Sequence, residues 1–174
     1  SERILTSDGL LALPTLPERI AVVGGSVIGA EFATLLAELG CRVTLWELMD
    51  RLIPAEDRDL SDFLAQALNR LGVEIRTGVR MTAIAEDRDG VTMTAEPAAR
   101  ERETQTLPWR GDGVLLAAGR RPGLDEASLE RLGIRYTPRG ISVGADGQTS
   151  VPGVYAVGDA TGGTMLAHRA MQQG

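Results

Sequence analysis

The hydrophobic positions of this chain follow two different spacings, and the spacing changes along the sequence. Between residues 19 and 76, short apolar runs are separated by longer segments in which apolar residues recur every three to four positions. Short runs are typical of buried strands, and the longer spacing is typical of amphipathic helices. This region is therefore predicted to fold as strand, helix, strand, helix, strand, which is the order of a parallel sheet covered by helices.

A glycine-rich turn joins the first predicted strand, residues 20–23, to the first long helix. The turn occupies residues 24–29, and Gly40 ends the helix, as glycine commonly does. A second strand over residues 43–46 then closes on Glu47. The apolar positions of this helix are Phe32, Leu35, Leu36 and Leu39.

The second helix is predicted over residues 59–71 and the third strand over residues 73–76. Farther along, apolar and polar residues alternate, which favours half-exposed strands. Two such strands, 79–86 and 91–96, are joined by a turn that ends in Asp-Gly, and a third covers residues 103–109. The apolar face of the second helix comprises Leu60, Phe63, Leu64, Ala67, Leu68 and Leu71.

The remaining pattern adds a buried strand over residues 112–119 and a short helix over residues 124–132. A hairpin is predicted within residues 141–147, and a short buried strand over residues 154–157. A last helix begins near residue 165. Together these elements predict an α/β fold, a Rossmann-type parallel sheet with an inserted antiparallel β-meander.

Each part of the glycine turn has a physical task in binding a dinucleotide. Gly24 allows a tight turn out of the strand, and Gly29 allows helix and strand backbones to approach closely. Unpaired N–H groups at the helix start suit a pyrophosphate, and Glu47, about 20 residues farther on, can accept hydrogen bonds from a ribose. Ser26 stands where a second glycine is usual. The turn and its flanking elements predict a dinucleotide site, and a purely structural glycine turn is the alternative.

The acid at residue 47 also predicts NAD rather than NADP, because a 2′-phosphate would meet a like charge. Arg51 and Arg58 weigh slightly against this choice, since either side chain can reach a phosphate. Replacing Glu47 with arginine is accordingly predicted to weaken NADH binding and to improve NADPH binding.

Composition makes several other functions improbable. The 174 residues carry a net charge of −6 without a basic patch, so a nucleic-acid partner is not expected. No apolar run approaches the length that crosses a bilayer, so no membrane partner is expected either. The single cysteine, Cys41, fits a reducing, cytoplasmic compartment and is predicted to be a small core residue. The single histidine, His168, has no further ligand at metal-binding spacing, so no metal site is predicted.

Four segments, in order, resemble the FAD-dependent pyridine-nucleotide disulfide oxidoreductases. GGSVIGAEFA is similar to the family's NAD site, AAGRRPG to the loop beside that cofactor, and TSVPGVYAVGDAT to its second FAD motif. MLAHRAMQQG is similar to the segment that follows in the dihydrolipoamide-oxidising branch. The resemblance covers nearly the whole chain. Gly123 departs from the family pattern. In the family, an asparagine usually follows the proline of the GRRP motif, and here Gly123 stands at that position.

The resemblance implies a cofactor contact for each matching residue. Glu31 would lie where the nicotinamide meets the flavin, Glu47 would hold the adenosine ribose, and Asp159 would bind the ribityl chain of FAD. The other implied contacts are Gly24, Gly25, Ser26, Val27, Ile28 and Gly29 at the pyrophosphate, Gly119 and Arg120 at the edge of NAD, and Met165, Leu166, Ala167 and His168 beside the flavin.

Residues 1–18 are predicted to be a lead-in or linker, because Pro14 and Pro17 precede the first strand. The resemblance implies an NAD-binding domain over residues 19–140 and a fragment of the FAD-binding domain over residues 141–174. The parent enzyme, a homodimer, would pass hydride between nicotinamide and FAD, with dihydrolipoamide as donor and NAD⁺ as acceptor. Its redox cysteines, catalytic histidine and interface domain would lie outside these residues. No catalytic residue is therefore predicted here, and the fragment is expected to be catalytically incomplete.

Two other functions stay open at this point. One is a domain of an NADPH-dependent disulfide or metal-ion reductase. The other is a non-catalytic nucleotide-sensing module, which would bind the cofactor without a redox cysteine pair elsewhere in the protein.

Overall fold

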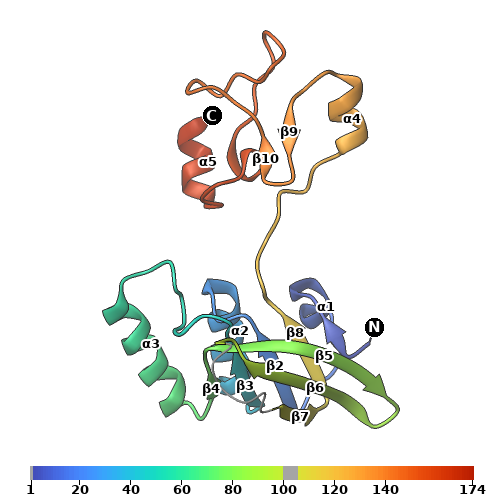
Figure 1. Ribbon diagram of the computed structural model, residues 1–174, viewed down its shortest axis with the longest axis vertical. Helices are drawn as coiled ribbons and strands as arrows, with labels where there is room; N and C mark the ends of the chain where they lie inside the picture. The colour runs from blue at the N-terminus through green and yellow to red at the C-terminus, as the bar shows by residue number, and fades with distance from the viewer. Residues whose placement is uncertain (1, 100–105) are drawn as a thin grey trace. The chain divides into compact units, whose positions relative to one another are not determined.

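The computed structural model describes residues 2–99 and 106–174, which form two compact units (Figure 1). The first unit ends at Gly119, and the second runs from Arg120 to Gly174. The predicted boundary after residue 140 separates an NAD-binding from an FAD-binding part, whereas the two units are defined by contacts alone. The boundary between the cofactor-binding parts therefore stays a prediction.

A five-stranded parallel sheet forms the centre of the first unit. Its strands lie in the order β1-β8-β2-β3-β4, and every neighbouring pair is parallel. The strands are β1 (Ile4–Leu5), β8 (Gly113–Leu116), β2 (Arg19–Val23), β3 (Arg42–Trp46) and β4 (Glu74–Arg76). The predicted parallel sheet is confirmed. Its edge strand β1 was not predicted and lies in the segment expected to be a lead-in.

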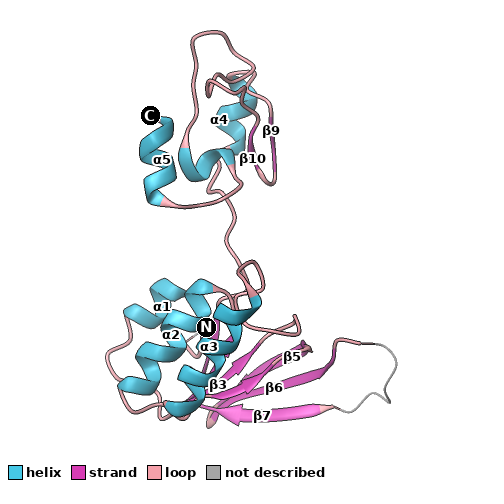
Figure 2. Ribbon diagram, turned by 90° about the vertical axis from the view of Figure 1, so that its left-hand side faces the viewer, coloured by secondary structure: helices cyan, strands magenta, loops and turns pink. Residues whose placement is uncertain are grey.

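Helices cover one face of this sheet, and a second, antiparallel sheet covers the other (Figure 2). The helices are α1 (Ser7–Leu11), α2 (Val27–Glu38) and α3 (Arg58–Arg70). The antiparallel sheet consists of β5 (Val79–Asp87), β6 (Gly90–Pro97) and β7 (Leu107–Gly111), paired in that order. It is the predicted meander. The beginning of the predicted third strand, residues 103–105, lies outside the described residues.

The side chains of β2 point alternately into these two layers. Ile20 and Val22 belong to the core beneath the helices, and Ala21 and Val23 belong to the core beneath the meander. All four are buried. A strand covered on both faces has no polar side, which is why its sequence is a continuous apolar run.

A chain of polar contacts links the parallel sheet to the meander. The indole N–H of Trp109 on β7 donates to the hydroxyl of Thr44 on β3 over 3.1 Å, and that hydroxyl donates to Glu74 on β4, also over 3.1 Å. Arg76 pairs with Glu74 and lies 4.7 Å from the ring centre of Trp46. Burial alone would raise the pKa of Glu74, but the hydrogen bond and charge of Arg76, with the Thr44 hydroxyl, lower that pKa.

The buried face of each long helix differs from its apolar pattern. The buried residues of α2 are Gly29, Ala30, Ala33 and Leu36. Leu35 and Leu39 are exposed, as are Leu60 and Phe63 on α3, where Leu68 is buried. Small side chains bring a helix backbone close to the sheet, so neighbouring large side chains are left at the rim.

The single thiol behaves as predicted for a core residue. Cys41 lies just before β3 and is buried among the residues beneath the helices. Burial raises the pKa of its thiol. The reactive thiolate form is therefore disfavoured at neutral pH.

The second unit contains two short helices, one short hairpin and a 3₁₀ turn. These elements are α4 (Glu126–Arg131), β9 (Tyr136–Thr137), β10 (Gly140–Ile141), η1 (Gly158–Thr161) and α5 (Ala167–Gln173). The helices predicted over residues 124–132 and after residue 165 are confirmed as α4 and α5.

Two predictions in this unit are wrong. The hairpin predicted within residues 141–147 forms upstream instead, where β9 pairs with β10. Residues 154–157 form no strand, only a single antiparallel bridge between Tyr155 and Gln148, and most of these side chains are exposed. A buried parallel strand needs paired neighbours and cover on both faces. The described part of this unit supplies neither.

Candidate functional site

A cleft of about 390 Å³ opens at the edge of the parallel sheet where β2, β3 and β8 end. Open α/β sheets bind ligands outside the carboxyl ends of their strands, so this is the expected edge for a cofactor. Four of the predicted cofactor residues line the cleft together: Gly24, Ser26, Glu47 and Gly119.

Two glycines shape the turn between β2 and α2, because neighbouring backbone leaves no room for a side chain. Gly24 has a φ of +112°, and a Cβ there would overlap the carbonyl group of Ala117, which follows β8. A Cβ on Gly29 would overlap the carbonyl oxygen of Gly24. Gly29 does make a close backbone approach, but its partner is Gly24 of the turn, whereas the prediction was an approach between helix and strand.

Glu47 is buried at the end of β3, and both oxygens of its carboxylate accept backbone hydrogen bonds. Oε2 accepts the N–H of Gly25 at 2.5 Å, and Oε1 accepts the N–H of Met49 at 2.7 Å. A carboxylate has about four acceptor sites, so capacity remains for ribose hydroxyl groups. The Gly25 N–H, in contrast, is already committed, and a phosphate would have to compete for it with Glu47.

The first turn of α2 leaves backbone donors available. Ser26 is the N-cap residue, and its side chain makes no capping hydrogen bond. The first helical hydrogen bond runs from the N–H of Ala30 to the carbonyl of Ser26 at 2.9 Å. The N–H groups of Val27 and Ile28 therefore have no acceptor within the helix and carry the partial positive charge of a helix start. Glu31, one turn farther along, is exposed and does not line the cleft.

The start of β5 also lines the cleft, although the sequence pattern did not single it out. The N–H of Val79 donates to the carbonyl of Glu47 at 3.1 Å and so brings this strand to the same edge. Because β4 is parallel to β3, residues that follow β4 emerge beside the end of β3, and this signal was present in the sequence. The lining residues missed from the sequence include Val79, Arg80, Met81, Met49 and Pro54.

Neither arginine considered as a phosphate ligand lines the cleft. The Arg51 guanidinium donates to the carbonyl oxygens of Pro54 and Glu56, at 3.0 and 3.3 Å, and so closes its own loop. Arg58 is the first residue of α3. Among the described lining residues, the cation is Arg80, and it is exposed.

Two predicted cofactor residues of the second unit contact each other. A terminal nitrogen of Arg120 lies 3.2 Å from Oδ2 of Asp159, and both side chains are about half exposed. Asp159 lies in η1, which is joined to α5 by a hydrogen bond from the N–H of Gly158 to Gln173 at 2.8 Å. The residues predicted beside a flavin, Met165, Leu166, Ala167 and His168, lie at the N-terminal end of α5.

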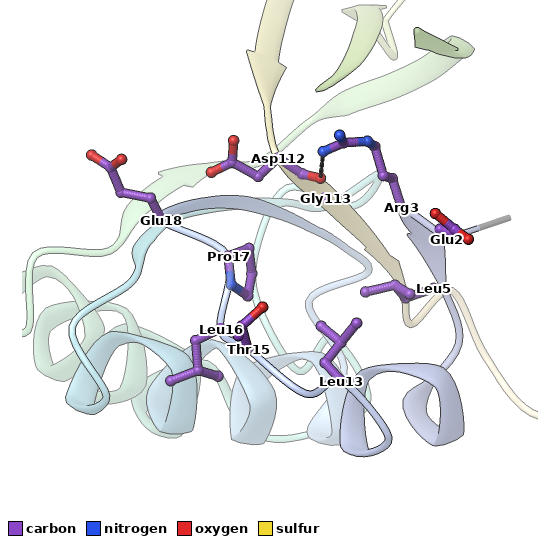
Figure 3. A pocket seen from close by; sticks show the side chains of 10 residues that line it. All are labelled: Glu2, Arg3, Leu5, Leu13, Thr15, Leu16, Pro17, Glu18, Asp112 and Gly113. Atoms are coloured by element: carbon purple, nitrogen blue, oxygen red, sulfur yellow. Dashed lines mark hydrogen bonds between the residues drawn. The ribbon is translucent and has the colours of Figure 1, made fainter. Parts of the chain in front are cut away.

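A second cavity, of about 430 Å³, lies at the opposite ends of the same strands (Figure 3). It is lined by residues that precede or begin β1, β2 and β8, among them Arg3, Pro17 and Asp112. The Asp112 carboxylate accepts the N–H of Arg19 at 2.8 Å, and the Asp112 carbonyl accepts Arg3 at 3.3 Å. These charged groups hold the strand starts together, and this is the edge that does not bind ligands in open α/β sheets.

Residues 2–99 and 106–174 contain no group of three or more histidine, cysteine, aspartate or glutamate side chains placed to hold a metal ion. Within the same ranges, no helix combines the length and apolar character needed to span a membrane.

Comparison with known sequences gives consistent matches. Residues 1–174 match the family described as pyridine nucleotide-disulphide oxidoreductase. The chain is 43% identical over 173 residues to a dihydrolipoyl dehydrogenase of Bacillus subtilis, a match covering 99% of this chain and 36% of the relative. It is 38% identical over 170 residues to dihydrolipoyl dehydrogenase 3 of Pseudomonas putida, covering 98% and 36%. The chain thus spans about 36% of the length of these relatives.

Solved structures match as well. LpdA from Mycobacterium tuberculosis aligns with a TM-score of 0.84 at 33% identity, over 99% of this chain and 36% of that one. RclA, an HOCl-induced flavoprotein disulfide reductase from Escherichia coli, aligns with a TM-score of 0.86 at 29% identity, over 98% and 37%. The sequence resemblance is confirmed: this chain belongs to the pyridine nucleotide-disulphide oxidoreductase family.

Proposed function

We propose that the first unit binds NAD(H) in the cleft at the carboxyl edge of its parallel sheet. The observation that carries this proposal is that buried Glu47 and Ser26, the N-cap residue of α2 whose side chain makes no capping hydrogen bond, line one cleft. The uncommitted N–H groups of Val27 and Ile28 suit a diphosphate, and the remaining lone pairs of Glu47 suit the hydroxyl groups of the adenosine ribose.

The rest of the cleft suits an adenine ring, which is flat and only weakly polar. Val79, Met81, Met49 and Pro54 supply apolar surface, and buried Trp46 also lines the cleft. Ligand sites typically combine such surface with a few well-placed polar groups. The residues present therefore fit a nicotinamide dinucleotide.

In the whole protein, we propose a dihydrolipoyl dehydrogenase-like function for this cofactor site. When both are bound, nicotinamide and FAD supply hydride and electron transfer. Asp159 and the segment 165–168 would hold the flavin, and Glu31 would lie near the nicotinamide. The sequence has one cysteine, Cys41, so a redox disulfide would require residues outside these 174.

A second candidate is an NADPH-dependent reductase of the same family. The observation in its favour is Arg80, an exposed cation that lines the cleft together with Glu47. A 2′-phosphate would be attracted by the arginine and repelled by the carboxylate. Glu47 is the buried group of the two and is fixed by two hydrogen bonds, which favours NAD.

Titration of the chain with NADH and with NADPH tests this proposal. Trp46 lines the cleft, so its fluorescence is a suitable signal, and a Trp109→Phe variant isolates it. NADH is expected to bind at least about tenfold more tightly than NADPH, because a second negative charge beside Glu47 is unfavourable. Tighter binding of NADPH would favour the second candidate. Absence of binding by either nucleotide would contradict the site.

A pair of glycine substitutions locates the binding. Gly29→Ala is expected to abolish NADH binding, because its Cβ would overlap the Gly24 carbonyl. Gly9→Ala is the matched control, since a Cβ there has nothing closer than 3.6 Å. Circular dichroism of both variants separates loss of the site from loss of the fold. Unchanged binding by Gly29→Ala would place the nucleotide elsewhere.

A further inference from the structure

The loop between β3 and α3 holds the second glycine of the turn through three separate groups. The N–H of Gly25 donates to Glu47, and the carbonyl of Gly25 accepts the N–H of Ile53 at 2.7 Å. Leu52 is 1% exposed, and a Cβ on Gly25 would lie 2.6 Å from Cδ2 of that leucine. The loop thus contacts the N–H group of Gly25, its carbonyl group and the space where a side chain would stand.

Ile53 makes its contact from a strained backbone. Its φ is +39°, and it is the one non-glycine residue with positive φ in the part of the chain that the structure describes. A β-branched residue rarely adopts this left-handed conformation, which persists only where the surroundings over-determine it. Here the strain accompanies a hydrogen bond to the turn that receives the nucleotide.

Ser61 on α3 is hydrogen-bonded to the same loop. Its side chain is 1% exposed, and its hydroxyl donates to the carbonyl of Leu52 at 2.7 Å. Leu52 and Ile53 are adjacent, so hydrogen bonds connect α3 through this loop to Gly25. Ser61 itself does not line the cleft.

We propose that residues 47–53 form a clamp that holds the glycine turn in its nucleotide-binding shape, and that Ile53 and Ser61 are positioning residues for the nucleotide. This inference rests on the proposed function. A turn that is already ordered presents the N–H groups of Val27 and Ile28 without an ordering cost at binding. Ser61 can affect the nucleotide only through the clamp.

Two substitutions on α3 in the 174-residue chain test the clamp. Ser61→Ala removes the donor to Leu52 and is expected to raise the Kd for NADH about three- to tenfold, the effect of one buried hydrogen bond. Leu68→Ala is the control, because it removes core packing from the same helix and has no side-chain hydrogen bond to the loop. It is expected to lower the unfolding midpoint and to keep the Kd within about twofold while folded.

Two results would overturn the clamp. One is wild-type affinity in folded Ser61→Ala, and the other is an equal loss of affinity in both variants, which would reflect lost stability alone.

Amide hydrogen exchange tests the clamp without any substitution. The N–H groups of Gly25, Met49 and Ile53 are expected to exchange slowly in the nucleotide-free chain and to gain little protection from added NADH. Fast exchange that slows only with NADH would overturn the inference. If the wild-type chain does not bind NADH, the proposed function fails, while slow exchange of these groups would still show the clamp.

Discussion

At the scale of single residues, Glu47 differs from a specificity residue that meets only its ligand. Its two oxygens hold the N–H groups of Gly25 and Met49, so the carboxylate shapes the site as well as facing it. Any substitution at this position therefore changes the protein and the ligand contact together. The sequence-based prediction that Glu47→Arg favours NADPH over NADH considers only the contact with the ligand and leaves out the two backbone hydrogen bonds.

Glu47→Arg is consequently expected to lose NADH binding without gaining NADPH binding. Arginine has no acceptor, so both N–H groups would lose their partners, at about 1–3 kcal/mol each in unfolding free energy. Titration with both nucleotides and thermal unfolding measure the two effects. Glu47→Gln is the control, because it keeps one acceptor oxygen and should be intermediate. A Glu47→Arg protein of wild-type stability that prefers NADPH would show that the carboxylate acts on the ligand alone.

The local part of this site could be predicted from the sequence. Gly24 and Gly29 are required by the backbone of the turn itself, and Glu47 follows from the end of a strand. The contacts of Glu47 with Gly25 and Met49 could not be predicted, because they depend on an irregular loop. Nor does any local pattern encode the positive φ of Ile53.

At the scale of elements, the parallel sheet and the meander share the polar chain of Trp109, Thr44 and Glu74. The pKa of Glu74 is lowered in the folded protein, with Arg76 as the main lowering influence against the effect of burial. A carboxyl group of this kind stabilises the fold above its unfolded pKa, about 4.3, and this stabilisation is lost as the pH falls through the folded pKa.

Glu74→Gln is expected to reduce the loss of stability on acidification between about pH 5 and pH 3. The side chain of Glu74 is 49% exposed, so the difference at neutral pH is expected to stay below about 1 kcal/mol. Thermal unfolding across this pH range measures the effect. Glu38→Gln, at the exposed end of α2, is the control for loss of a surface carboxylate. Acid curves of identical shape for Glu74→Gln and the wild type would contradict the assignment.

Pattern and pairing have separate parts in deciding these elements. Apart from the short elements β1 and α1, the strands and the two long helices of the first unit could be predicted, because each buries one or two faces against another element. Residues 154–157 are as apolar as β2, but β2 has paired neighbours on both sides, β3 and β8. An apolar run therefore predicts a candidate strand, and its pairing partners decide whether the strand forms.

At the scale of the whole molecule, the candidate cleft belongs to one unit. All strands of the parallel sheet and of the meander lie before residue 119. The residues that line the cleft also lie before residue 119, except for Gly119 itself. The order of the cofactor motifs could be predicted from the sequence. The position of the division between the units, inside the segment AAGRRPG, could not, because it depends on contacts between distant residues.

The chain of residues 1–119 is therefore expected to fold by itself and to bind NADH within about twofold of the 174-residue chain. Circular dichroism and the same fluorescence titration measure this, with the longer chain as the reference. Substantially weaker binding by a folded 1–119 would mean that residues after Gly119 contribute to the site.

The burial of Cys41 has a practical outcome for such measurements. Maleimide and iodoacetamide reagents attack accessible thiolates, so little labelling of the native protein is expected. A cysteine placed at an exposed position such as Glu38 would then be the sole attachment point for a dye. Motion of the α2 helix could be followed in this way with no need to remove the native thiol first.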